Sequence, residues 1–113
     1  MKFRPMMIAV ALTGALAATR AAAQAPDGKA LYDEHCKKCH GVVGRPPKTM
    51  KEKFPKIFTF DAAFVGARSD DSVVKVLTRG KNEDMVSFKD KMKADEMMAV
   101  AKYVRELGLK SHP

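Results

Sequence analysis

Two cysteines and a histidine lie together in the stretch Cys36-Lys37-Lys38-Cys39-His40. They are the only two cysteines among 113 residues. Cysteines three positions apart lie about one helical turn apart on one face, so both thiols can reach one edge of a flat ligand. The next residue can then offer an imidazole nitrogen to a metal ion. This C-x-x-C-H spacing is the pattern of covalent haem attachment, in which the thiols form thioethers with the haem vinyl groups and the histidine binds iron.

Other uses of the same residues have requirements that the sequence meets less well. A dithiol redox site also contains C-x-x-C, but it needs a thioredoxin-like βαβ context, and no strand pattern flanks this motif. A structural zinc site needs four ligands, and the motif supplies three at most. A surface disulfide between the two cysteines is conceivable in an exported chain. We favour haem attachment over these three alternatives.

An iron held by one histidine has a second open face. A thioether sulfur there stabilises the ferrous state and raises the reduction potential, which suits electron transfer. Beyond the first 25 residues the chain has five methionines, Met50, Met85, Met92, Met97 and Met98. Met97 and Met98 fit the pattern of a packed terminal helix, whereas Met85 lies in a loop-like stretch between Gly80 and Phe88. These positions favour Met85 without excluding the others.

Caps and turn residues divide the rest of the chain into helices and loops. Asp27 and Ser69 are suited to begin helices, and Gly80 and Gly108 are suited to end them. The segments expected to be helical are 26–35, 61–65, 69–80 and 93–107. The stretch 41–60, interrupted by Gly44, Pro46, Pro47 and Pro55, and the stretch 81–92 are expected to be loops. The last helix carries an apolar stripe formed by Met97, Val100, Ala101, Val104 and Leu107.

Two stretches, DGKALYDEHCKKCHG and RGKNEDMVSFKDKM with the following MMAVAKYVREL, resemble the class I cytochromes c. The resemblance covers residues 27–107. It implies an all-α cytochrome c fold in which three to five helices surround one covalently attached haem c. The N- and C-terminal helices of that fold cross. The resemblance further implies that Cys36 and Cys39 carry the haem and that His40 and Met85 are the axial iron ligands.

The resemblance also gives expectations for the surrounding residues. Gly28 and Tyr32 match the small and aromatic residues at the helix crossing, where Tyr103 is expected to meet them. A proline carbonyl, of Pro47 first or Pro55 second, is expected to accept a hydrogen bond from the ligand histidine. The walls of the haem site are expected to include Met50, Phe54, Ile57, Phe58 and Phe60. Remoter candidates for the sixth ligand are Met92, His35 and His112.

The chain departs from the family pattern at two places. Val86 follows Met85 where the family commonly has proline, so a backbone N–H must be satisfied and the loop is less rigid. An iron–sulfur bond in such a loop is easier to displace. Lys93 stands where the family favours a Ser, Thr or Asp helix cap.

The first residues have the layout of a secretory signal peptide. Lys2 and Arg4 precede an apolar run at 6–18, and small residues suited to cleavage follow it. The run is shorter than the ~20 apolar residues that cross a membrane. We therefore expect residues 1–25 to be a cleaved signal peptide, residues 26–113 to be the cytochrome c domain, and the bacterial periplasm to be its location.

Charge and motifs indicate the kind of partner. The three basic residues of the signal segment lower the formal charge of +8 to +5 (8 − 3) when they are removed. The remaining excess suits acidic redox proteins through electrostatic steering. Nucleic acid is disfavoured, because the lysines are scattered and no binding motif is visible. From their positions in the sequence, Lys37, Lys38 and Lys89 are expected to lie near the haem edge.

Three functions are compatible with a haem attachment motif. The favoured one is a monomeric periplasmic electron carrier with His/Met-ligated iron, which would not itself be an enzyme. The first alternative is a haem subunit of a larger oxidoreductase. The less favoured alternative is a peroxidase or gas sensor, which needs an open iron site; the Met85 loop argues against it and Val86 argues weakly for it.

Overall fold

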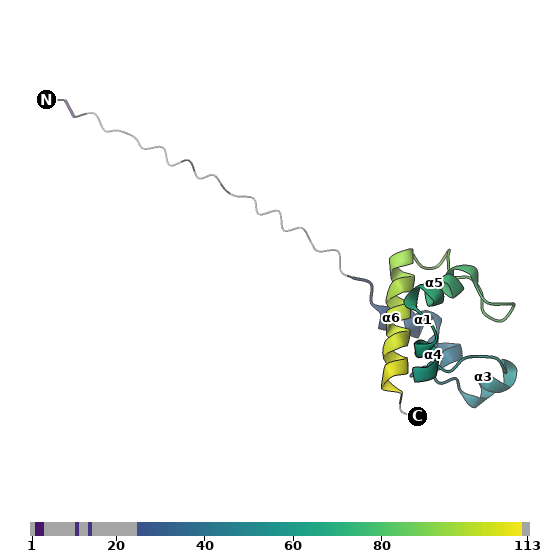
Figure 1. The fold of residues 1–113 in the computed structure, drawn as a ribbon. Coiled ribbons are helices and arrows are strands. Elements are labelled where there is room, and N and C mark those ends of the chain that lie inside the picture. The colour runs from purple at the N-terminus through teal and green to yellow at the C-terminus, as the bar shows by residue number, and fades with distance from the viewer. Residues whose placement is uncertain (1, 4–10, 12–13, 15–24, 112–113) are drawn as a thin grey trace.

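The computed structural model describes residues 2–3, 11, 14 and 25–111, so most of the expected signal peptide lies outside the described residues. The described part is helical and contains no strand, which confirms the expected all-α fold class (Figure 1). There are six helices in it, one more than the expected upper number. They are α1 (Gly28–His35), α2 (Lys37–His40), α3 (Lys48–Lys53), α4 (Ala62–Gly66), α5 (Asp70–Arg79) and α6 (Ala94–Lys110).

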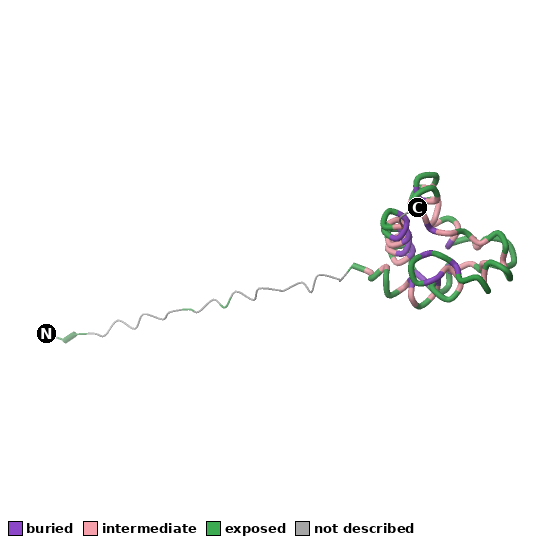
Figure 2. Tube along the Cα trace, turned by 90° about the horizontal axis from the view of Figure 1, so that it is seen from below, coloured by how far each residue is buried: buried purple, intermediate pink, exposed green. Residues whose placement is uncertain are grey.

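Three helices, α1, α4 and α5, pack against α6. The predicted apolar stripe is confirmed, because all five of its residues are buried. Figure 2 shows this buried face of α6 turned toward the rest of the domain. Although α6 is the longest helix described, neither it nor any other helix in that part of the chain has the length and apolar character needed to cross a membrane.

The predicted crossing of the first and last helices is confirmed. A Cβ atom on Gly28 would overlap the carbonyl oxygen of Ala99 and lie 3.2 Å from Cβ of Tyr103. Tyr32, which has no exposed surface, meets Tyr103 edge to face with ring centroids 5.2 Å apart. The glycine therefore permits a backbone approach that any side chain would prevent.

Side-chain caps fix where the helices begin. Asp27, Asp61 and Ser69 each accept a hydrogen bond from the backbone N–H three residues on, at 3.1, 2.8 and 3.2 Å. The last helix begins after Lys93, a residue with no acceptor to offer as a cap. Here the Glu96 carboxylate accepts from the Lys93 N–H at 2.9 Å. A first-turn acid thus compensates for the unfavourable cap residue.

Two expectations about secondary structure are wrong. The stretch 41–60 is not entirely loop, because it contains α3. Pro47 directly precedes this helix, and its φ of −59° is compatible with a helix start. Gly108 does not end the last helix, which continues to Lys110. Gly108 is buried, and a Cβ on it would lie 2.6 Å from Cγ1 of Val65 and 2.9 Å from the Asp61 carbonyl oxygen. This glycine serves the close approach of α4 rather than helix termination.

Candidate haem-binding site

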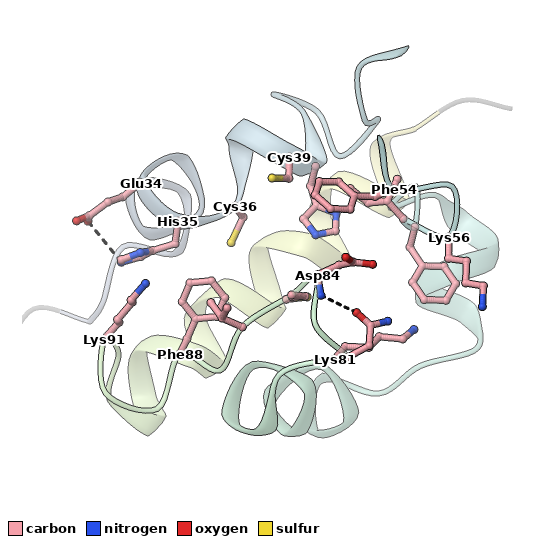
Figure 3. A pocket seen from close by; sticks show the side chains of 16 residues that line it. Glu34, His35, Cys36, Cys39, Phe54, Lys56, Lys81, Asp84, Phe88 and Lys91 are labelled. Atoms are coloured by element: carbon pink, nitrogen blue, oxygen red, sulfur yellow. Dashed lines mark hydrogen bonds and ion pairs between the residues drawn. The ribbon is translucent and has the colours of Figure 1, made fainter. Parts of the chain in front are cut away.

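A cavity of about 680 Å³ opens between the α1–α2 segment, the stretch before α4 and the loop before α6. Its size is within the ~300–1,000 Å³ range usual for ligand and cofactor sites. Figure 3 shows Cys36 and Cys39 on one side of it, with Lys81 and Asp84 on the facing loop. All four predicted site residues, Cys36, Cys39, His40 and Met85, line this cavity.

The break between α1 and α2 positions the C-x-x-C-H motif. Cys36 ends α1 by donating its N–H to the Tyr32 carbonyl at 2.8 Å, and it also begins α2. Cys39 and His40 then lie on that short helix, which ends where Gly41 adopts a φ of +84°. Both cysteines are free thiols. The two sulfurs and the imidazole therefore reach one cavity from a single turn of chain.

A tight turn presents Met85 to the same cavity. Lys81 and Met85 pair through their backbones, with N–H to carbonyl distances of 2.8 and 3.3 Å. Gly80 has a φ of +74°, and a Cβ there would lie 2.9 Å from the Met85 carbonyl oxygen. The loop is anchored beyond the turn, where the Phe88 N–H donates to the Leu77 carbonyl at 2.7 Å. Glycine at position 80 is therefore required for this turn.

The other candidate ligands lie elsewhere or at the cavity edge. Met92 and Met97 are buried core residues, and neither these nor Met50 nor Met98 line the cavity. His35 does line it, but its ring packs edge to face on Phe88 with centroids 5.7 Å apart. His112 lies outside the described residues. Among the described methionines, Met85 alone borders the site.

Burial shapes the protonation of the motif. Desolvation lowers the pKa of His40, although the Phe58 backbone opposes the shift, so the imidazole is neutral as a metal ligand must be. Burial, and secondarily the neighbouring Cys39, raises the pKa of the Cys36 thiol to about 12. A dithiol redox site needs a lowered thiol pKa, so this result counts against that alternative.

The His40 ring does not make the expected hydrogen bond to a proline carbonyl. Its Nδ1 is buried and has no hydrogen-bond partner among the described residues, so neither Pro47 nor Pro55 accepts from it. The ring instead stacks on Phe60, with centroids 4.6 Å apart and planes at 20°. Phe60 was expected as a wall residue, but no sequence pattern indicated a stacking role. It does not line the cavity, and it contacts the histidine from behind.

The walls are largely apolar and the mouth carries charge. Phe54, Ile57 and Phe58 line the cavity as expected, and Met50 does not. The mouth lysines are Lys56, Lys81 and Lys91, all exposed, and they lie with the acids Glu34 and Asp84. Sequence position pointed instead to Lys37, Lys38 and Lys89, which are exposed but are not among the lining residues.

These features fit a covalently held haem. An apolar cavity with two thiols, a neutral imidazole and a thioether sulfur on its walls offers what thioether attachment and iron ligation require. A structural zinc site fits less well, because nowhere in residues 25–111 do three or more His, Cys, Asp or Glu side chains converge as metal ligands.

Comparisons with known proteins agree with this interpretation. The sequence profile of the family described as cytochrome c oxidase, cbb3-type, subunit III matches residues 23–104. A solved structure described as KustC0563 c-type cytochrome is 33% identical, with a TM-score of 0.66 over 74% of this chain and 99% of that chain. No curated protein matches. The profile match covers more than half of the sequence.

Proposed function

The chain belongs to the cytochrome c family, and on this premise we propose that it is a monohaem electron carrier that passes single electrons between redox partners. As a c-type cytochrome it carries covalently bound haem c with iron. The observation that carries the proposal is the gathering of two thiols, one imidazole and one thioether sulfur around one apolar cavity.

Each of the four site residues has a proposed role. Cys36 and Cys39 form the two thioether links, and His40 and Met85 are the axial ligands of the iron. When bound, the haem supplies a one-electron ferric/ferrous couple whose potential a methionine ligand raises. If both His40 and Met85 ligate the iron, no position on it is left open for peroxide or a gas.

The surroundings of the site support an electron carrier. Phe54, Ile57 and Phe58 make their part of the cavity wall apolar, and an apolar wall favours the less charged state of a bound redox centre. The lysines at the mouth orient acidic partners at long range, and this attraction weakens as salt screens it. We propose a soluble monomer in the periplasm, released there by cleavage of residues 1–25; the basic start and apolar run of that segment support this location.

Absorption spectra of the exported protein test the proposal. We expect one haem c per chain by pyridine haemochrome and a low-spin spectrum in both oxidation states. Met85→Leu should lower the reduction potential by roughly 0.1 V or more, because axial ligands span about 0.8 V. Met92→Leu makes the same chemical change in the core and should leave ligation intact. A shift caused by Met92→Leu alone would transfer the ligand role to Met92.

A second candidate function is a haem subunit within a larger oxidoreductase. It is favoured by one observation, namely that the matching profile is described as that of an oxidase subunit. The two candidates differ in what the native protein is bound to. Size-exclusion chromatography of native extracts should yield a free monomer for a carrier, whereas constant co-elution with a larger redox complex would make the chain a subunit.

A further inference from the structure

A second cavity, of about 870 Å³, lies on a different part of the surface. It is bordered by the loop after α2, by α3, by the start of α4 and by the C-terminal end of α6. None of its lining residues lines the haem cavity. The two are separated by the ring of Phe60, which borders this groove and stacks on His40.

The floor of the groove is apolar and partly exposed. Phe60 and Leu107 form its deep part, and each has 8% of its surface exposed. Ala62 and Ala63 supply a flat, exposed edge. Val43 stands beside them with 59% of its surface exposed. An apolar side chain from another molecule would be buried against this floor.

The rim of the groove is positively charged. Arg45, Lys51 and Lys110 line it from three different elements, and all three are exposed. Within the described residues, Arg45 and Lys51 form no ion pair, and Lys110 meets only an exposed glutamate at 3.8 Å. The one acid of the rim, Asp61, already caps α4 by accepting from the Phe64 N–H at 2.8 Å. Arg45 and Lys51 are therefore available to an outside partner, and the exposed pair that Lys110 makes with Glu106 is long enough to be exchanged for one.

We propose that this groove docks an acidic segment of a partner protein, with carboxylates on either side of one apolar side chain. The carboxylates pair with the rim cations, and the apolar side chain covers the floor. A simple inorganic anion could pair with the cations but has no apolar group to contact the floor. Docking here leaves the mouth of the haem cavity free. The groove can therefore bind one partner while a second partner faces the mouth of the haem cavity. The docking proposal does not depend on which residues ligate the iron.

Titration of the isotope-labelled ferrous holoprotein with an acetylated, amidated Glu-Glu-Phe-Glu-Glu peptide tests the proposal by amide NMR. We expect saturable shifts at the groove residues and weak or no shifts with the Gln-for-Glu peptide. The double variant Arg45→Glu/Lys51→Glu should weaken binding by roughly tenfold or more, because two attractions become repulsions. Lys75→Glu/Lys102→Glu makes the same charge change on exposed parts of α5 and α6, and should weaken it less than about threefold.

Several outcomes would overturn the proposal. They are shifts confined to Lys56, Lys81 and Lys91 at the haem cavity, equal loss of affinity in both double variants, or no saturable shift. Full displacement of the peptide by inorganic phosphate would show that the groove binds anions through its rim and that the apolar floor does not contribute. Dimerisation of the protein alone through these residues, seen by analytical ultracentrifugation, would assign the groove to a second copy. Ala63→Leu, which fills the floor without changing charge, should also weaken peptide binding.

Discussion

The phenyl ring of Phe60 stacks on the imidazole of His40, with centroids 4.6 Å apart and planes 20° from parallel. Gly44 makes this possible: it adopts a φ of +79° and accepts from the Phe60 N–H at 2.7 Å. A Cβ on Gly44 would lie only 2.8 Å from Cβ of Phe60. Because His40 Nδ1 has no partner within hydrogen-bond geometry among the described residues, the stacking on Phe60 is a main contact that orients the ring.

Replacing this ring should therefore alter the iron ligand as well as stability. We expect Phe60→Leu to shift the reduction potential and the paramagnetic NMR signals of the His40 ring, because the imidazole gains freedom about its Cβ bond. Phe60→Tyr keeps an aromatic ring and should leave the reduction potential and the His40 signals close to those of the unchanged protein. Phe64→Leu is the matched control: Phe64 packs on Phe60 with centroids 4.9 Å apart but has no recorded ring contact with His40. Equal shifts in potential from both leucine variants would refute the positioning role.

The crossing of α1 and α6 depends on the missing side chain of Gly28. Gly28→Ala should destabilise the protein by about 1–3 kcal/mol, the usual cost of overpacking, because the added methyl would overlap the Ala99 carbonyl. Gly66→Ala is the control, since nothing lies within 4 Å of a Cβ there. That change should be neutral or stabilising by up to ~1 kcal/mol. Urea denaturation followed by far-UV circular dichroism measures both.

The phenol of Tyr32 links α1 to the end of the C-x-x-C-H motif. It is fully buried, and its hydroxyl donates to the Gly41 carbonyl at 2.6 Å. Tyr32→Phe leaves that carbonyl without its partner and should cost about 1–3 kcal/mol in the free energy of unfolding. Tyr103→Phe removes a hydroxyl that has no hydrogen-bond partner among the described residues, and should cost less than about 0.5 kcal/mol. Similar losses for the two variants would mean that the Tyr32 bond contributes nothing measurable.

Local patterns in the sequence predicted most helices and four residues that the fold brings to one cavity. The C-x-x-C-H motif occupies one helical turn, so its spacing already implied that both thiols and the imidazole face one cavity. Asp27, Asp61 and Ser69 cap helices through contacts three residues away, which sequence position alone can indicate. Met85 was distinguishable because it lies in a loop, while the other late methionines fit a helix stripe or the core.

Contacts between distant segments were not visible in the sequence. Gly108 looked like a helix end because that is where glycine is commonly found, but its position is determined by Val65 on another helix. The stacking of Phe60 on His40 joins residues twenty positions apart, and aromatic residues of that stretch all looked like equivalent wall positions. The lysines at the cavity mouth likewise come from two separated segments, the stretch before α4 and the loop between α5 and α6.

Arg105 joins three helices through one guanidinium group. Projecting from α6, it donates to the Val65 carbonyl at 3.1 Å, to the Arg68 carbonyl at 2.7 Å and to the Asp70 carboxylate at 2.7 Å. These acceptors lie at the end of α4, in the connection and at the start of α5. The Arg105 and Asp70 side chains are 34% and 29% exposed, so water screens part of the ion pair. The two bonds to backbone carbonyls are therefore the larger share of its effect.

Arg105→Lys should remain destabilising even though it keeps the charge. An ammonium group on a flexible stem cannot reach three acceptors arranged for a planar fork. With about 0.5–1.5 kcal/mol for each hydrogen bond, we expect a loss of about 1–3 kcal/mol in the free energy of unfolding. Arg79→Lys, at an exposed position on α5 without a recorded ion pair, should change stability by less than about 0.5 kcal/mol. If Arg105→Lys were equally harmless, charge alone would account for the contact, and the fork geometry would not matter.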